Sequence, residues 1–211
     1  MNTAIKITLS RIVAIPVVIA VYLIDFTAHK IVTCALFTFL ACTDFIDGHI
    51  ARSRNQVTDL GKFLDPIADK ILVVVFLFLL VGDNTLPHPW GAICCGAIIM
   101  REFIISAFRL LASTKNIVIS ADAWGKAKTV FTDVAIAVLI ISGDPIFLHG
   151  EGALHVFEQI FYIGGSVIFY ISVALTIYSG IHYILKNKNV FSPVAVREEQ
   201  PQEPNDSDRN D

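Results

Sequence analysis

Long runs of apolar residues alternate with short polar stretches along most of the chain. A helix needs roughly 20 mainly apolar residues to cross the roughly 30 Å hydrocarbon core of a bilayer. The segments that meet this requirement are residues 5–24, 31–52, 60–81, 91–112, 123–141 and 157–185. The pattern therefore predicts an all-α membrane protein with six transmembrane helices.

The last part of the chain differs from the rest. Residues 191–211 are polar, acidic and contain proline, a composition typical of disordered segments. We therefore expect one transmembrane domain over residues 1–190, followed by a disordered cytoplasmic tail over residues 191–211. No small-residue cleavage site follows the first apolar run, so we interpret that run as a retained helix rather than a signal peptide.

The composition agrees with a membrane location. Hydrophobic residues make up 55% of the chain and charged residues only 17%, whereas soluble domains have about 25% charged residues. The formal net charge is -3, but the distribution of charge is more informative than its sum. We expect membrane lipids, and not nucleic acid, as partners.

Lysine and arginine are concentrated on one side of the predicted topology. They occur at the N-terminus, in the second and fourth connections and after the last segment, at Lys6, Arg11, Arg52, Arg54, Lys62, Lys115, Lys126, Lys128, Lys186 and Lys188. The loops at residues 83–90 and 143–152 contain neither residue, and only Lys30 lies on that side. Because such residues favour the cytoplasmic side, both termini are expected to face the cytoplasm, in a bacterial inner membrane.

Four aspartates lie at helical spacing around the second connection. The chain reads Asp44-Phe-Ile-Asp47-Gly-His-Ile-Ala-Arg, and after eight residues Gly-Lys-Phe-Leu-Asp65-Pro-Ile-Ala-Asp69. Positions three or four apart share one face of a helix. The short polar turn between the two segments makes the helices antiparallel neighbours, so the four carboxylates are expected to converge.

The depth of these carboxylates indicates a functional site. A helix rises about 24 Å from Ile31 to Asp47 at roughly 1.5 Å per residue, which places the aspartates below the lipid headgroups. Ionised groups at that depth are costly and usually functional. Hard divalent cations, Mg²⁺ or Mn²⁺, are the expected counter-charge. Gly48, Ala51 and Gly61 leave room for a ligand or a neighbouring helix close to the backbone.

The stretch from Asp44 to Asp69 resembles the signature of the CDP-alcohol phosphatidyltransferase family, D-x-x-D-G-x-x-A-R, eight residues, then G-x-x-x-D-x-x-x-D. The resemblance implies six transmembrane helices, a homodimer and a site facing the cytoplasm. It also implies that the aspartates hold two metal ions against the diphosphate of a CDP-linked lipid such as CDP-diacylglycerol.

The same resemblance implies roles for single residues. Asp69 would be the general base that takes the proton from the acceptor hydroxyl. Gly48, Ala51 and Arg52, with Gly61 opposite, would bind the CDP-linked lipid. We favour in-line attack by the acceptor, since the sequence offers no additional nucleophile.

Cations at the same side of the membrane point to an acceptor that carries its own phosphate. They are Arg101, Arg109, Lys126 and Lys128. The patterns M-R-E-x-x-I-S-x-x-R and G-K-x-K-T in this region resemble the phosphatidylglycerophosphate synthase branch of the family, whose acceptor is sn-glycerol 3-phosphate.

Several alternatives remain open. Within the family, the acceptor could be phosphatidylglycerol, inositol, inositol phosphate or serine, and the first of these would make the protein a cardiolipin synthase. A membrane prenyltransferase also holds a diphosphate with aspartates and Mg²⁺. A cation transporter would spread its carboxylates along a path through the membrane, whereas these lie together near one face.

Overall fold

The computed structural model describes the backbone of residues 3–53, 59–115, 123–148 and 152–191, and the side chains of residues 9–43, 70–115, 123–147, 152–188 and 190. These ranges contain helices and no strand. The helices are α1 (Thr3–Leu23), α2 (His29–Ser53), α3 (Asp59–Gly82), α4 (Trp90–Thr114), α5 (Ala123–Ser142), α6 (Pro145–Leu148), α7 (Ala153–Lys186) and the 3₁₀ helix η1 (Lys188–Phe191).

Each of the six predicted segments coincides with one long helix. Predicted and observed ends differ by at most four residues, and the largest difference is at the start of α7. Two short elements were not predicted, α6 and η1, because a single turn is too short to show a periodic pattern. The predicted tail lies outside the described residues, which end at Phe191.

Within the described part of the chain, α4 and α7 are long and apolar enough to cross a membrane. Shorter apolar helical stretches cover Leu9–Leu23, His29–Thr43 and Lys70–Gly82. The all-helical character and these apolar helices agree with a membrane protein.

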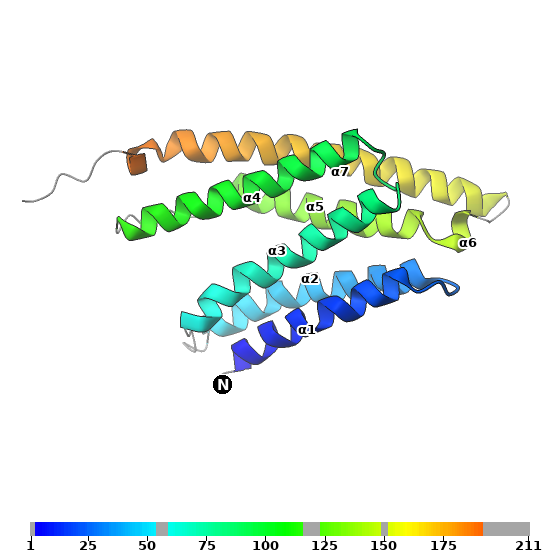
Figure 1. The fold of residues 1–211 in the computed structure, drawn as a ribbon, viewed down its shortest axis with the longest axis horizontal. Coiled ribbons are helices and arrows are strands. Elements are labelled where there is room, and N and C mark those ends of the chain that lie inside the picture. The colour runs from blue at the N-terminus through cyan, green and yellow to red at the C-terminus, as the bar shows by residue number, and fades with distance from the viewer. Residues whose placement is uncertain (1–2, 54–58, 116–122, 149–151, 192–211) are drawn as a thin grey trace, which may run out of the picture.

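The long helices form two neighbouring groups (Figure 1). One contains α1, α2 and α3, and the other contains α4, α5 and α7. Helix α3 joins the groups, since it contacts α1, α4 and α5. The start of α1 and the end of α7 lie at the same end of the bundle, on the left in Figure 1. We call this the near end and the opposite one the far end.

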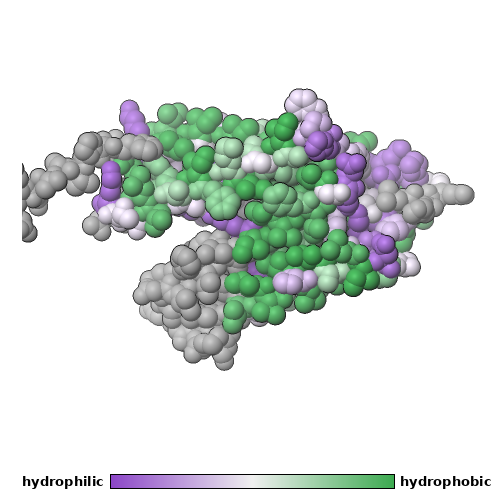
Figure 2. All heavy atoms as spheres, viewed as in Figure 1, coloured by the Kyte–Doolittle hydropathy of each residue, from purple (hydrophilic) through white to green (hydrophobic). Residues whose placement is uncertain are grey.

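The bundle is apolar on the outside and partly polar within. The visible face is covered mainly by hydrophobic residues (Figure 2), and large side chains such as Phe39, Phe103 and Leu110 are more than 60% exposed. Inside, Ser172 and Thr176 of α7 are fully buried, and each hydroxyl donates to a backbone carbonyl of the preceding turn. This distribution suits a protein surrounded by lipid rather than water.

Helices α5 and α7 pack closely because α7 carries small residues on the shared face. A Cβ atom placed on Gly165 would lie 2.9 Å from Cγ of Leu139 in α5. Small residues let membrane helices approach one another, and close contact stabilises them through dispersion. The close approach at Gly165 thus limits how α5 and α7 can shift against one another.

A polar cluster, which we call the far-end clip, connects four helices at the far end. The carboxylate of Asp144 accepts hydrogen bonds from the backbone N–H groups of Lys30 and Ile31, each 3.1 Å long, in the first turn of α2. The Lys30 ammonium lies 2.6 Å from the carboxylate of Asp83, which also accepts a hydrogen bond from the Tyr22 hydroxyl. The ends of α1, α2, α3 and α5 are thus joined by direct polar contacts.

Candidate active site

The predicted aspartates all fall within helices. Asp44 and Asp47 belong to the last turns of α2, and Asp65 and Asp69 belong to the first half of α3. The residues predicted to bind the CDP-linked lipid lie on the same two helices, at Gly48, Ala51, Arg52 and Gly61. The side chains of all eight residues are outside the described part of the chain.

The described halves of α2 and α3 fix the register of these positions. The rings of Phe37 and Phe76 pack edge to face, with centroids 5.0 Å apart. Asp44 follows Phe37 by seven residues, and Asp69 precedes Phe76 by seven. Seven residues are about two helical turns and a rise of about 10 Å. The backbone positions of Asp44 and Asp69 therefore lie equally far from the Phe37–Phe76 contact, toward the near end. Each lies on the helix face that carries the phenylalanine ring.

Glu102 of α4 is the centre of a polar network beside these helices. Its Oε1 atom accepts a 3.0 Å hydrogen bond from Nη1 of Arg101 and a second one from the ammonium of Lys128 in α5. Nη2 of Arg101 donates to the hydroxyl of Ser179 in α7, also at 3.0 Å. The carboxylate therefore holds two cations from different helices, and the guanidinium extends the network to a third.

The network reaches α3 through Lys70, the residue directly after Asp69. Its ammonium donates to the hydroxyl of Ser106 in α4. That hydroxyl donates its own hydrogen to the backbone carbonyl of Glu102, at 2.7 Å. The helix that carries Asp69 is thus connected, one residue further on, to the helix that carries Arg101.

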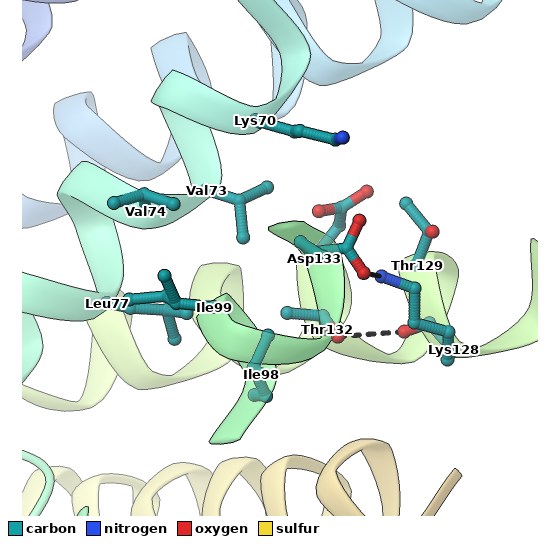
Figure 3. Close-up of a pocket in the computed structure, with 11 residues that line it drawn as sticks. Lys70, Val73, Val74, Leu77, Ile98, Ile99, Lys128, Thr129, Thr132 and Asp133 are labelled. Atoms are coloured by element: carbon teal, nitrogen blue, oxygen red, sulfur yellow. Dashed lines mark hydrogen bonds and ion pairs between the residues drawn. The ribbon is translucent and has the colours of Figure 1, made fainter. Parts of the chain in front are cut away.

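A small cavity of about 30 Å³ lies between α3, α4 and α5. Polar side chains gather on one side of it, including Lys70, Lys128 and Asp133, and apolar side chains line the other (Figure 3). A volume of this size holds a water molecule or two. The cavity is thus a partly polar space that Lys70, Glu102 and Lys128 of the network all border.

The structure brings together two of the four cations predicted to bind the acceptor. Arg101 and Lys128 share the carboxylate of Glu102, and their side chains are 12% and 7% exposed. Arg109 lies two turns along α4, where its Nε donates to the hydroxyl of Tyr183 at 3.2 Å. Lys126 is exposed at the start of α5.

Some residues of the network and its surroundings were not predicted. Lys70 and Ser179 of the network were missed, as were Asp133, which lines the cavity, and Tyr183, which accepts from Arg109. For Ser179 the sequence contained a signal, since Ser172, Thr176 and Ser179 recur at spacings of four and three within an apolar helix. The pairing of Glu102 with Lys128 gives no such signal, because it depends on how α4 and α5 are placed.

The donor set fits a hard divalent cation. Aspartate oxygens are the ligands that Mg²⁺ and Mn²⁺ prefer, and the four aspartates occupy neighbouring turns of two helices that contact one another through Phe37 and Phe76. Among the residues whose side chains are described, no group of three or more His, Cys, Asp or Glu could hold a metal. The four aspartates of α2 and α3 are thus residues whose chemistry and placement along the two helices suit such an ion.

Comparison with known proteins identifies the family. The family profile described as CDP-alcohol phosphatidyltransferase matches residues 1–178. A Rickettsia felis protein named CDP-diacylglycerol–glycerol-3-phosphate 3-phosphatidyltransferase is 34% identical over 185 residues, which are 87% of this chain and 94% of that protein. A Bacillus subtilis protein of the same name is 33% identical over 195 residues, covering 86% of this chain and 93% of its own length.

A third protein of that name, from Haemophilus influenzae, is 31% identical over 186 residues, or 87% of this chain and 91% of the relative. The family profile covers α1 to α6 and most of α7, including both aspartate-bearing segments. The chain therefore belongs to the CDP-alcohol phosphatidyltransferase family.

Proposed function

We propose that the protein is a phosphatidylglycerophosphate synthase, which transfers the phosphatidyl group of CDP-diacylglycerol to sn-glycerol 3-phosphate and releases CMP. The acceptor oxygen forms a bond to the phosphatidyl phosphorus as the bond from that phosphorus to CMP breaks. The proton of the acceptor hydroxyl goes to a base of the enzyme. The family membership and the names of the relatives support this reaction.

The donor side of the site is assigned to α2 and α3. Asp44, Asp47, Asp65 and Asp69 would hold two Mg²⁺ or Mn²⁺ ions. When bound, these ions neutralise the diphosphate and stabilise the charge that develops on the departing CMP. The equal two-turn displacement of Asp44 and Asp69 from the Phe37–Phe76 contact supports this assignment, since it puts both positions at one depth.

The same two helices also supply the groups that bind and activate the substrates. Besides its part in holding the metal ions, Asp69 accepts the proton of the acceptor hydroxyl, as a general base close to the reacting atoms. Gly48, Ala51 and Gly61 let the nucleotide approach the backbone, and the guanidinium of Arg52 binds its phosphate. The acyl chains lie along the apolar outer surface of the helices.

The acceptor assignment is carried by one observation, the convergence of Arg101 and Lys128 on Glu102. Two cations from different helices are held at fixed positions in an apolar bundle, one helix away from Lys70 and Asp69. A phosphate monoester is an anion that such a pair binds well. Arg109 and Lys126, nearer the near end, would attract the acceptor and complete its binding.

The arrangement in the membrane follows from the same proposal. The helices α1, α2, α3, α4, α5 and α7 each cross the bilayer, with the near end toward the cytoplasm of a bacterial inner membrane. Glycerol 3-phosphate and the nucleotide headgroup of CDP-diacylglycerol then both reach the site from the cytoplasm. The enzyme works as a homodimer.

The proposal is tested by measuring CMP release from CDP-diacylglycerol by the purified protein in Mg²⁺. The acceptors to compare are glycerol 3-phosphate, inositol, inositol phosphate, serine and phosphatidylglycerol. We expect release to require glycerol 3-phosphate and to be lost in Asp69→Asn. The matched control is Asp25→Asn, since Asp25 is exposed in the connection between α1 and α2.

Each result decides a different part of the proposal. Release with another acceptor and not with glycerol 3-phosphate would overturn the acceptor assignment and leave the donor side intact. Full activity of Asp69→Asn would overturn the role of that residue. The absence of release with every acceptor, in protein that is folded, would overturn the catalytic proposal.

A further inference from the structure

Lys70 is a cation that lies between the two halves of the proposed site. It follows Asp69 directly in α3, and its side chain lines the cavity that Lys128 borders from α5 (Figure 3). It lies within a long apolar helix, where a charged side chain is costly and usually functional. The donor and acceptor sides of the site therefore meet at this residue.

The described partner of Lys70 is a neutral group. The Ser106 hydroxyl has one hydrogen, and it donates that hydrogen to the carbonyl of Glu102. It can therefore only accept from the Lys70 ammonium. By contrast, Arg101 and Lys128 are bound to the carboxylate of Glu102. Of these three cations, Lys70 is therefore the one whose described contact is with a hydroxyl group and not with the Glu102 carboxylate.

The reaction itself places two requirements on the acceptor. Its reacting hydroxyl must reach the base at Asp69, while its phosphate must meet a cation a short distance away, because glycerol 3-phosphate carries the two groups at opposite ends of three carbons. An ammonium one residue from the base, at the edge of a cavity that Lys128 also borders, meets the second requirement, since the small volume there suffices for one phosphate oxygen in place of water. A lysine acts as a compact point charge with three donors, which suits a phosphate oxygen.

We propose that Lys70 binds the phosphate of the acceptor together with Lys128, and that Ser106 is the positioning residue that directs its ammonium into the cavity. The inference rests on the proposed function and deepens it, because it names the residue that selects a phosphorylated acceptor. The Lys70 ammonium has three N–H donors, so it keeps the Ser106 hydroxyl and donates a further hydrogen bond to a phosphate oxygen. The covalent chemistry is unchanged.

The test compares Lys70→Met with the wild type in CMP release, with each substrate varied in turn. We expect the KM for glycerol 3-phosphate to rise at least tenfold, while the KM for CDP-diacylglycerol stays within twofold. Lys70→Arg, which keeps the charge, should recover part of the loss. Ser106→Ala should raise the same KM about threefold, because the ammonium loses its fixed position.

Inorganic phosphate supplies a second readout. It should compete with glycerol 3-phosphate in the wild type and should compete at least tenfold more weakly in Lys70→Met. The matched control is Lys186→Met, since Lys186 is exposed in the last turn of α7. Its kinetic constants should equal those of the wild type.

The possible results separate this inference from the proposed function. An unchanged KM for glycerol 3-phosphate in folded Lys70→Met overturns the role of Lys70 and leaves the reaction standing. An equal rise in both KM values also overturns it, since that result marks a residue that only supports the fold. If Lys70→Met does not fold, the ratio of the two KM values in Lys70→Arg and Ser106→Ala decides. A wild type that ignores glycerol 3-phosphate overturns the function itself.

Discussion

The guanidinium of Arg101 in α4 lies 3.0 Å from the hydroxyl of Ser179 in α7. Ser179 is fully buried, and the same guanidinium contacts Glu102 through its other terminal nitrogen. Arg101 is therefore fixed at two points on different helices. This fixed position makes it suitable for binding an acceptor phosphate, because little conformational freedom is lost when the ligand binds.

Replacing Ser179 with alanine tests the value of that fixed position. The variant leaves one guanidinium N–H without its partner, at a cost of about 1–2 kcal/mol. We expect the KM for glycerol 3-phosphate to rise about fivefold, as measured by CMP release. Ser172→Ala is the matched control, since Ser172 is equally buried on α7 but bonds only to the carbonyl of Phe169 among its described contacts. A KM in Ser179→Ala equal to that in Ser172→Ala would contradict the prediction.

Neutralising Glu102 should harm both stability and activity. Removing one partner from a buried ion pair leaves an uncompensated charge and costs on the order of 3 kcal/mol, and here two cations lose their partner. We expect Glu102→Gln to unfold at a clearly lower temperature and to lose more than tenfold in kcat/KM for the acceptor. Glu102→Asp should recover part of both losses.

The control for this experiment is Glu158→Gln in α7. The Glu158 side chain is as little exposed as that of Glu102, but its partner at 3.5 Å is His155, whose side chain is 57% exposed. A pair in which one partner is so accessible to solvent contributes less than about 1 kcal/mol. Its unfolding temperature should stay close to that of the wild type. Thermal unfolding in detergent, monitored by circular dichroism, measures both variants. Equal stability of Glu102→Gln and Glu158→Gln would show that the Glu102 network is not a stabilising one.

Removal of divalent cations should abolish the reaction. With a chelator present, the four aspartates lose their counter-charge, and CMP release should fall to background. Adding Mg²⁺ or Mn²⁺ in excess should restore it. In Asp44→Asn the Mg²⁺ concentration for half-maximal activity should rise at least tenfold, whereas Asp25→Asn should need the wild-type concentration. Activity that persists in the chelator would contradict the metal assignment.

The far-end clip should weaken in acid through Asp83. Burial raises the pKa of this carboxyl group, but hydrogen bonds from Lys30 and Tyr22 outweigh it, so the pKa is lowered from the ordinary value of 3.8. A lowered pKa means that the carboxylate stabilises the fold above about pH 4 and that this stabilisation is lost as the pH falls through the folded-state value. The unfolding temperature of the wild type should therefore exceed that of Asp83→Asn at pH 7, and the difference should shrink below pH 4. A difference that is constant down to pH 3 would contradict this origin.

Two adjacent glycines of α7 offer a matched test of helix packing. A Cβ on Gly165 would lie 2.9 Å from Leu139, whereas a Cβ on Gly164 would meet nothing within 4 Å. Overpacking of this kind costs about 1–3 kcal/mol, so Gly165→Ala should lower the unfolding temperature. Gly164→Ala should leave it unchanged or raise it, since alanine is the better helix former. If both variants behave alike, α5 and α7 do not pack as closely as described.

Much of the fold could be predicted from the sequence because length and hydropathy specify membrane helices well. The polar residues that follow Ser53 and Gly82 in the sequence mark the ends of α2 and α3 to within one residue of the prediction. Helix α7 begins four residues before its predicted start, because His155 interrupts the apolar run and yet lies in the exposed first turn of the helix.

The site was only partly predictable, for a physical reason. The aspartates and the cations are recognisable by residue type and spacing, which are local properties. The contact of Arg101 with Ser179, and that of Lys70 with Ser106, join residues 78 and 36 positions apart. Such contacts depend on the packing of α4 against α7 and α3, which no local pattern reports.

The far-end clip has a mechanical consequence. It joins α1, α2, α3 and α5 at the end opposite to the aspartates, so each of these helices acts as a lever with its fulcrum there. Helix α3 has 24 residues and a length of about 36 Å, and a rotation of one degree about Asp83 moves its other end by about 0.6 Å. A small change in helix angle at the far-end clip would therefore alter the distance between the aspartate-bearing parts of α2 and α3 at the near end.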